Sequence, residues 1–272
     1  MKILFISLGC DKNLADSEEM LGLLTGNGHE IVDSEEEADA IVINTCCFIH
    51  DAKEESVNTI LEMAEYKKTG TCKILIVTGC MAQRYKEEIT EEIPEVDAVL
   101  GTTSYGDIVK ALNEAEAGHV FQEFKDINAL PEDSGRRVIT TGGHFGYLKI
   151  AEGCDKHCTY CIIPSLRGKF RSVPEERLLK QAEYMASQGV RELILVAQET
   201  TVYGTDLYGK KTLHILLKKL CQIKGIRWIR VLYCYPEEIY DELIQVMKEE
   251  KKICHYLDLP IQHASDRILE RM

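Results

Sequence analysis

The chain has 272 residues, 45% of them hydrophobic, and is therefore long enough to bury a sizeable core and to form two domains. Its formal net charge of −13 repels nucleic-acid backbones at a distance and favours a basic protein or a small molecule as partner, although a local basic patch could still bind RNA. The sequence has neither an export signal nor an apolar run long enough to span a membrane, so we expect a cytoplasmic protein without a membrane partner.

The first 120 residues alternate short apolar segments with helix-period segments, a pattern typical of an open parallel sheet flanked by helices. Strands are predicted at residues 2–8, 39–45, 73–79 and 97–101. The first two helices are predicted at residues 14–28, with Asp16 and Ser17 as candidate caps, and at residues 51–70. We therefore expect an α/β protein whose amino-terminal half is a flavodoxin-like open sheet.

The periodicity fades between residues 121 and 146, where glycines and mixed charges predict a linker. We place an amino-terminal domain at residues 1–140 and a second domain at residues 141–272. The second domain is a further βα series, with strands predicted at residues 147–153, 191–198, 228–234 and 256–260. Its helices are predicted from Pro174 to Gln188, from Thr212 and from Pro236. Residues 265–272 look like a helix that is cut short, so we expect the natural chain to continue.

Three cysteines stand close together in the segment EGCDKHCTYC, where Cys154, Cys158 and Cys161 form a C-x3-C-x2-C pattern. With 11 cysteines and no export signal, metal binding or catalysis is a better explanation than disulfide bonds. The three follow a predicted strand, in the kind of loop where α/β proteins place ligands. Three thiolates on a four-iron cluster leave one iron open for a ligand. A structural zinc site normally has four ligands, and His157, wedged between two cysteines, rarely has the reach to be the fourth.

A second set of cysteines is spread over the amino-terminal half. Cys10, Cys46 and Cys80 each follow a predicted strand, so they should converge on one edge of the parallel sheet and could hold a second cluster. The alternative is that each is a small apolar residue at a strand end, which is ordinary for cysteine. Cys47 is an alternative ligand to Cys46, which we rank first.

The C-x3-C-x2-C motif resembles the signature of the radical S-adenosylmethionine (SAM) enzymes, and SLGCDKNLADSE, NTCCFI and TGCMAQR resemble the amino-terminal domain of the methylthiotransferases. The resemblance implies two 4Fe-4S clusters and SAM as cofactors, with the six cysteines named above as metal ligands. It also implies that the second domain is a TIM-type radical SAM barrel, here partial and truncated, and that the β-barrel (TRAM-type) domain usual at the carboxyl end of the family is absent.

Other candidate residues lie in the cluster loop or after predicted strands. In the radical SAM family, an aromatic residue near the adenine occupies the position of Tyr160. The remaining candidates for SAM binding are Arg167, Gln198, Glu199 and Thr200. Gln262 and His263 are weaker candidates for substrate binding, and a structural role is as plausible for His263. Polar strand exits and surface cations are common, so the residue types alone do not decide.

Further boxes, among them AEGCDKHCTYCIIPSLRG and LDLPIQHAS, resemble the branch of the family that adds a methylthio group to the β-carbon of an aspartate in small-subunit ribosomal protein S12. The resemblance implies a transferase in which reduced SAM gives a radical that removes a hydrogen from the aspartate, after which the second cluster supplies sulfur. An external electron donor and a sulfur donor are then needed. Three alternatives stay open: a tRNA adenosine methylthiotransferase, a non-enzymatic iron-sulfur electron carrier and a zinc-binding module.

Overall fold

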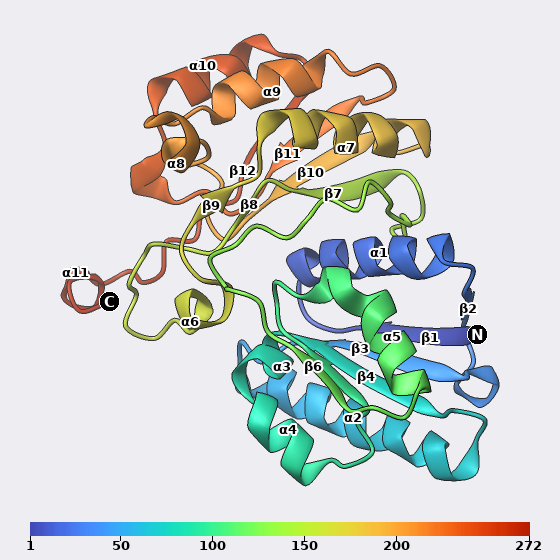
Figure 1. Ribbon diagram of the computed structural model, residues 1–272. Helices are drawn as coiled ribbons and strands as arrows, with labels where there is room; N and C mark the ends of the chain where they lie inside the picture. The colour runs from blue at the N-terminus through green and yellow to red at the C-terminus, as the bar shows by residue number, and fades with distance from the viewer. The chain divides into compact units, whose positions relative to one another are not determined.

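The computed structural model describes all 272 residues, which form two compact units, Met1–Val138 and Ile139–Met272. The predicted α/β class with an amino-terminal parallel sheet is confirmed (Figure 1). No helix in the structure combines the length and the apolar character that crossing a membrane requires.

The amino-terminal unit contains a sheet of six parallel strands in the order β2-β1-β3-β4-β5-β6. The strands are β1 (Lys2–Ser7), β2 (Glu30–Val32), β3 (Ala40–Thr45), β4 (Ile74–Gly79), β5 (Ala98–Leu100) and β6 (Phe121–Glu123). The helices are α1 (Asp11–Gly26), α2 (His50–Thr69), α3 (Cys80–Arg84), α4 (Lys86–Glu92) and α5 (Ile108–Glu116), with 3-10 turns η1 (Glu35–Glu37) and η2 (Tyr105–Asp107).

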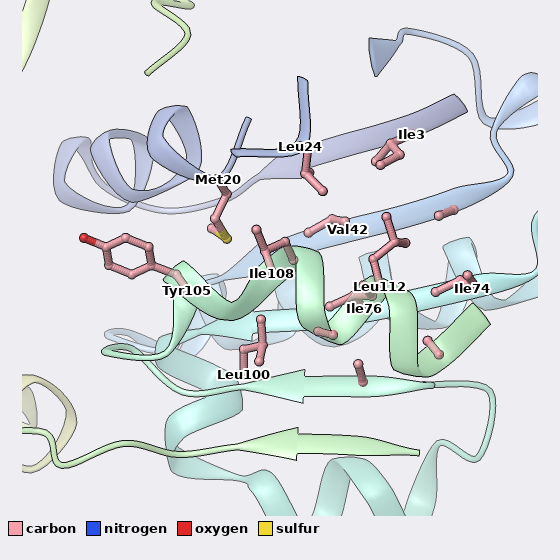
Figure 2. Close-up of a cluster of buried hydrophobic side chains, with 14 residues drawn as sticks. Ile3, Met20, Leu24, Val42, Ile74, Ile76, Leu100, Tyr105, Ile108 and Leu112 are labelled. Atoms are coloured by element: carbon pink, nitrogen blue, oxygen red, sulfur yellow. The ribbon is translucent and has the colours of Figure 1, made fainter. Parts of the chain in front are cut away.

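The helices cover both faces of this sheet, α1 and α5 on one and α2 on the other (Figure 1). Strands β3 and β4 are buried along their whole length, which explains why their sequences read as continuous apolar runs. Figure 2 shows one layer of the core, where side chains of α1 and α5 such as Met20 and Leu112 meet Ile3, Val42 and Ile76 from the strands. Because β1 pairs with both β2 and β3, the strand order reverses there, and such a reversal opens a crevice at the carboxyl edge.

The carboxyl-terminal unit contains four parallel strands in the order β12-β11-β10-β7 and a small antiparallel pair, β8 and β9. The strands are β7 (Phe145–Lys149), β8 (Ala151–Glu152), β9 (Arg171–Ser172), β10 (Glu192–Val196), β11 (Trp228–Val231) and β12 (Ile253–Leu257). The helices are α6 (Ile163–Arg167), α7 (Glu175–Ser187), α8 (Thr205–Tyr208), α9 (Leu213–Cys221), α10 (Asp241–Glu249) and α11 (Asp266–Leu269), with the 3-10 turn η3 (Pro236–Glu238).

In the four-stranded sheet, β7, β10, β11 and β12 lie side by side in chain order, and α7, α9 and α10 lie on the same face of the sheet (Figure 1). Each helix returns the chain to start the next parallel strand, which is the winding of a TIM-type barrel. All four strands therefore present their carboxyl ends, and the loops that follow them, at one edge.

Several boundaries differ from those predicted. Strands β2 and β6 were not predicted, because each is a short, partly exposed edge strand without a continuous apolar run. Strand β6 lies at the start of the segment predicted as linker. Helix α1 begins at Asp11 with Cys10 as its N-cap, so Asp16 and Ser17 lie inside the helix. The last strand, β12, begins three residues earlier than the predicted segment, at Ile253 rather than Tyr256.

A short strap, residues 136–138, packs across α1. The backbone of Arg136 passes so close that a Cβ at Gly22 would lie 2.6 Å from its carbonyl carbon, which explains a glycine inside a helix. The Arg137 guanidinium binds the Glu18 carboxylate at 2.6 Å and 2.8 Å, with both side chains buried. The Val138 N–H donates to the Glu18 carbonyl at 3.0 Å. The buried ion pair and this hydrogen bond thus hold the strap, at the end of the amino-terminal unit, against α1.

Replacing Arg137 with alanine should destabilise the amino-terminal unit by about 3–5 kcal/mol, because the Glu18 carboxylate then stays buried without its main counter-ion. The control Lys2→Ala breaks an exposed ion pair with Glu37 and should cost far less stability, because water screens exposed charges. Hydrogen exchange of β3 amides measures both. Equal losses in the two variants would contradict the role of the strap.

Candidate functional site

The first candidate site lies at the carboxyl edge of the six-stranded sheet. Cys10 follows β1 and is the N-cap of α1, Cys46 directly follows β3, and Cys80 follows β4 as the first residue of α3. Strands β1, β3 and β4 are neighbours in the sheet. The structure therefore places all three predicted cysteines on adjacent strand ends, Cys10 exposed and the other two buried.

A buried asparagine connects the three strand ends. The Asn13 amide donates to the carbonyl oxygens of Leu8 at 3.1 Å and Thr45 at 2.9 Å, which joins the ends of β1 and β3. Its side-chain oxygen lies 3.9 Å from the Cys80 sulfur and accepts the thiol hydrogen. One side chain in α1 thus touches the segments that carry all three cysteines.

Two further buried side chains fix the backbone around Cys46. The Asn44 amide donates to the Asn13 carbonyl and to the Ser17 hydroxyl, both at 2.9 Å. The Ser56 hydroxyl accepts from the Cys46 N–H at 3.0 Å and donates to the Cys46 carbonyl at 2.8 Å. Ser56 was not predicted as part of the site; a serine on the buried face of the amphipathic helix α2 was the available signal.

Two glycines allow the chain to approach these thiols closely. Gly9 has φ +90°, and a Cβ there would lie 2.7 Å from the Cys46 Cβ and 3.0 Å from its sulfur. Gly79 has φ +94°, and a Cβ there would lie 2.3 Å from the Asn44 side-chain oxygen. Real Cβ contacts do not reach such distances, so bare backbone forms part of the wall of this site.

Cys46 and its neighbour Cys47 have different surroundings. The Cys46 sulfur lies beside Gly9, on the side of β1 and Cys10. The Cys47 thiol donates to the Cys80 carbonyl oxygen at 3.3 Å. Burial and the neighbouring Cys80 thiol raise the pKa of Cys47 to about 11, against the opposing charge of Arg84. These surroundings favour Cys46 over Cys47 as a thiolate ligand, and the choice stays a prediction.

The second candidate site is the cluster loop, residues 153–162, which follows β8. Gly153 has φ +70°, and a Cβ there would lie 2.1 Å from the Lys169 carbonyl oxygen. The Cys154 N–H donates to the Gly168 carbonyl at 3.1 Å, and the Phe170 N–H donates to the Asp155 carboxylate at 2.9 Å. The loop is therefore held against the segment that leads into β9.

The three thiols of this loop are all half-buried. The Lys156 N–H donates to the Cys154 sulfur at 3.4 Å, and the Cys161 N–H donates to the Cys158 carbonyl at 3.0 Å. Burial raises the pKa of the Cys154 thiol, and the nearby thiols of Cys161 and Cys158 raise it further. No group of three or more potential ligands is close enough to hold a single metal ion. A four-iron cluster does not require such closeness, because each cysteine binds a different iron.

The loop after β10 brings buried polar atoms to the same edge. Glu199 is 2% exposed, and its Oε1 accepts from the backbone N–H groups of Thr201 at 3.0 Å and Tyr235 at 3.4 Å. Its Oε2 and the side-chain oxygen of Gln198 have no hydrogen-bond partner in the protein. Unpaired buried oxygens are costly, so they fit a ligand that donates hydrogen bonds, such as the amino group or ribose of SAM. The Thr200 hydroxyl, in contrast, donates to the Leu232 carbonyl at 2.8 Å and serves the fold.

The remaining predicted residues occupy three settings. The Tyr160 ring is 56% exposed and its hydroxyl donates to the Gln262 side-chain oxygen at 2.5 Å. His263 is exposed and its Nδ1 accepts from the Ser265 N–H at 2.9 Å. Arg167 is buried against the Glu152 carboxylate at 3.5 Å rather than presented at the surface. The structure thus brings Tyr160 and Gln262 together, whereas Arg167 already pairs with Glu152.

The comparisons with known proteins first define the class. Residues 2–101 match the family described as "Uncharacterized protein family UPF0004", and residues 148–272 match the radical SAM superfamily. The structure is similar to that of the radical S-adenosylmethionine methyltransferase TsrM from Kitasatospora setae, with a TM-score of 0.64 and 11% sequence identity. The match includes 98% of this chain and 60% of TsrM. The cobalamin-dependent S-adenosylmethionine radical enzyme OxsB covers 99% with a TM-score of 0.60 and 14% identity, over 45% of its own length. The chain therefore has the fold of a radical SAM protein.

The curated relatives then make the resemblance more specific. The chain is 68% identical, over all 272 residues, to a protein of Lachnoclostridium phytofermentans named "Ribosomal protein uS12 methylthiotransferase RimO". It is 53% identical to the protein of the same name from Clostridioides difficile. It spans 62% and 61% of the length of these two relatives. The chain is therefore similar over its whole length to proteins named as methylthiotransferases, and the predicted resemblance is confirmed.

Replacing Gly9 with alanine should displace Cys46, because the added methyl group would overlap the cysteine. The matched control is Gly28→Ala, which forces alanine into a similar φ of +85° with no atom within 4 Å. Both variants should lose about 1–2 kcal/mol for left-handed backbone, and only Gly9→Ala should also lose iron after anaerobic reconstitution. Iron analysis and thermal unfolding measure the two effects. Equal iron contents would contradict the close packing of Gly9 on Cys46.

Replacing Glu199 with glutamine should stabilise the iron-free protein at pH 8. Burial raises the pKa of Glu199 above 4.5, so the native protein loses stability as the pH rises from 4.5 through this raised pKa. Glutamine carries no charge, so the variant does not lose stability in this way. Its higher stability relative to the parent should disappear below pH 4.5. The control Glu238→Gln should act oppositely at pH 8, because Lys156 and Lys211 lower the pKa of Glu238. Thermal unfolding across pH measures both; a pH-independent effect of Glu199→Gln would contradict the prediction.

Proposed function

We propose that the chain is the cluster-bearing part of a radical SAM methylthiotransferase, a transferase that modifies the β-carbon of an aspartate in ribosomal protein uS12. The observation that carries this proposal is the presence of two separate sets of three cysteines, one after neighbouring strands of the amino-terminal parallel sheet and the other in the single loop that follows β8. Each set offers three thiolates, which leaves one iron of a four-iron cluster open. An electron carrier or a structural zinc site normally has no open position.

In the carboxyl-terminal unit, Cys154, Cys158 and Cys161 would hold one 4Fe-4S cluster, which supplies the one-electron reduction of SAM when bound. The unpaired Glu199 carboxylate oxygen and the Gln198 side chain would accept hydrogen bonds from SAM. The exposed Tyr160 ring, fixed through its hydroxyl by Gln262, would lie against the adenine. Thr200 would contribute by holding the backbone of Leu232. We keep Arg167 as a weaker candidate, because Glu152 already neutralises its charge.

In the amino-terminal unit, Cys10, Cys46 and Cys80 would hold the second cluster, the source of the methylthio sulfur. Asn13, Asn44 and Ser56 hold the backbone around these thiols through paired hydrogen bonds, so the ligands are oriented before iron arrives. The buried setting of Cys46 and Cys80 would exclude water from the sulfur.

The substrate assignment rests on the printed names of the relatives and on charge. A net charge of −13 favours a basic ribosomal protein as substrate and disfavours tRNA, the substrate of the alternative methylthiotransferases. The reaction would take place in the cytoplasm and would need an external electron donor and a sulfur donor. The segment Gln262–Ser265, which reads QHAS, is the candidate contact with the substrate.

The test replaces one cysteine of each set. Cys154→Ala should abolish SAM cleavage, a loss of at least about a hundredfold, because the cluster that reduces SAM loses a ligand. Cys80→Ala should still cleave SAM and should fail to transfer the methylthio group. Both should lower the iron content of anaerobically reconstituted protein relative to the parent. The measurements are iron and sulfide analysis, SAM cleavage under strong reductant, and mass spectrometry of uS12 and of tRNA.

Methylthiolation of tRNA rather than uS12 would favour the alternative substrate. A parent that binds iron but leaves SAM uncleaved under strong reductant would support the electron-carrier interpretation and contradict the proposal.

A further inference from the structure

The loop that follows β11, residues 232–238, borders the cluster loop and has an unusual backbone. Tyr233 has φ +57°, a left-handed conformation that is costly for a bulky residue. Its N–H donates to the Asp258 carboxylate at 3.0 Å, and the Cys234 N–H donates to the Asp258 carbonyl at 2.9 Å. Pro236 restricts the residue before it to an extended conformation, and Tyr235 has φ −76° and ψ 128°. The backbone direction of Tyr235 is therefore fixed on both sides.

The side chain of Tyr235 extends from this loop to a cysteine of the cluster loop. Its hydroxyl oxygen lies 3.9 Å from the Cys158 sulfur. Its backbone N–H donates to the Glu199 Oε1 at 3.4 Å. Tyr235 therefore contacts both the cluster loop and the loop after β10, which together form the candidate SAM site.

A charged cluster holds the Tyr235 ring in place. The Lys156 ammonium lies 4.6 Å from the ring centroid and 2.6 Å from the Glu238 carboxylate. The Lys211 ammonium contacts the same carboxylate at 2.9 Å and the Glu238 carbonyl at 2.7 Å. Lys156 lies between Cys154 and Cys158 in the sequence, so these ion pairs connect the cluster loop to the loop after β11.

The direction of the contact between Tyr235 and Cys158 follows from the chemistry of the ligand. Between a thiol and a phenol, either group can donate. A cysteine bound to iron is a thiolate and has no hydrogen to donate, so the phenol must then donate. A phenol, whose ordinary pKa is about 10, keeps its hydrogen at physiological pH.

We propose that Tyr235 is a positioning residue whose hydroxyl donates a hydrogen bond to the Cys158 sulfur and so sets the reduction potential of the cluster on Cys154, Cys158 and Cys161. The inference rests on the proposed function, because it requires that cluster. A hydrogen bond to a thiolate sulfur stabilises the electron-rich reduced cluster more than the oxidised one, which makes reduction easier. The residue acts through Cys158 and takes no part in the reaction itself.

The test uses the full chain with Cys10, Cys46 and Cys80 replaced by alanine, so that one cluster alone contributes to the spectrum. After anaerobic reconstitution with iron and sulfide, an EPR-monitored redox titration gives the midpoint potential. Tyr235→Phe should lower the equilibrium constant for reduction by about tenfold, a shift of about 59 mV to more negative potential. The matched control is Tyr240→Phe, which removes a hydroxyl that contacts the His214 Nδ1 at 3.1 Å and should leave the potential unchanged.

A second variant strengthens the donor without removing it. Site-specific 3-fluorotyrosine at position 235 keeps the shape of the side chain and makes the phenol a stronger donor, so the potential should shift to more positive values. A loaded parent with no shift in either variant overturns this inference and leaves the proposed function standing. If Tyr235→Phe binds no cluster, the fluorotyrosine protein decides, and an unchanged potential there overturns the inference. A parent that takes up no iron overturns the proposed function and this inference together.

Discussion

Parallel strand pairing is the constraint on which both candidate sites depend. Every strand of a parallel sheet ends at the same edge, so residues that directly follow neighbouring strands become neighbours in space however far apart they are in sequence. The pairing of β3 with β1 and β4 brings Cys10, Cys46 and Cys80 together in this way. In the carboxyl-terminal unit, the pairing of β10 with β7 and β11 places Glu199 near the cluster loop and near Tyr235.

Sheet pairing brings the segments together but does not fix the positions of the thiols. Buried polar side chains fix them by binding the backbone nearby. Around the amino-terminal cysteines, Asn13, Asn44 and Ser56 use their hydrogen-bonding groups on backbone atoms, which makes the local chain geometry strongly determined. Glu199 differs, because one of its oxygens stays unpaired inside the protein. A fold that tolerates such an unfavourable atom is expected to gain something from it when a ligand binds.

The elements and residues predicted from the sequence are those with strong local signals. Strands β3 and β4 are continuous apolar runs, and the C-x3-C-x2-C motif lies within eight residues, so both were found without tertiary information. The short edge strands β2 and β6 carry no such signal, and the N-cap of α1 is a cysteine rather than a typical capping residue.

Features that arise from contacts between distant segments were not predicted. The burial of Arg167 on Glu152 depends on tertiary packing, and so does the pairing of Arg137 with Glu18. The same is true of Tyr235, whose hydroxyl meets a cysteine from another loop. Residue type and spacing report which side chains can do chemistry, whereas long-range packing decides which of them are available for it.

The spacing of the two cysteine sets also determines how each would affect the mechanics of the chain. Cys154, Cys158 and Cys161 lie within one loop, so a cluster there would cross-link only a few residues. Cys10, Cys46 and Cys80 lie in three segments separated by whole βα units, so a cluster there would cross-link β1, β3 and β4 and close two long loops of the unfolded chain. Closing long loops removes more chain entropy from the unfolded state. Iron bound to the amino-terminal set would therefore stabilise the folded amino-terminal unit. Oxidative loss of that iron would destabilise the sheet as well as remove the sulfur source.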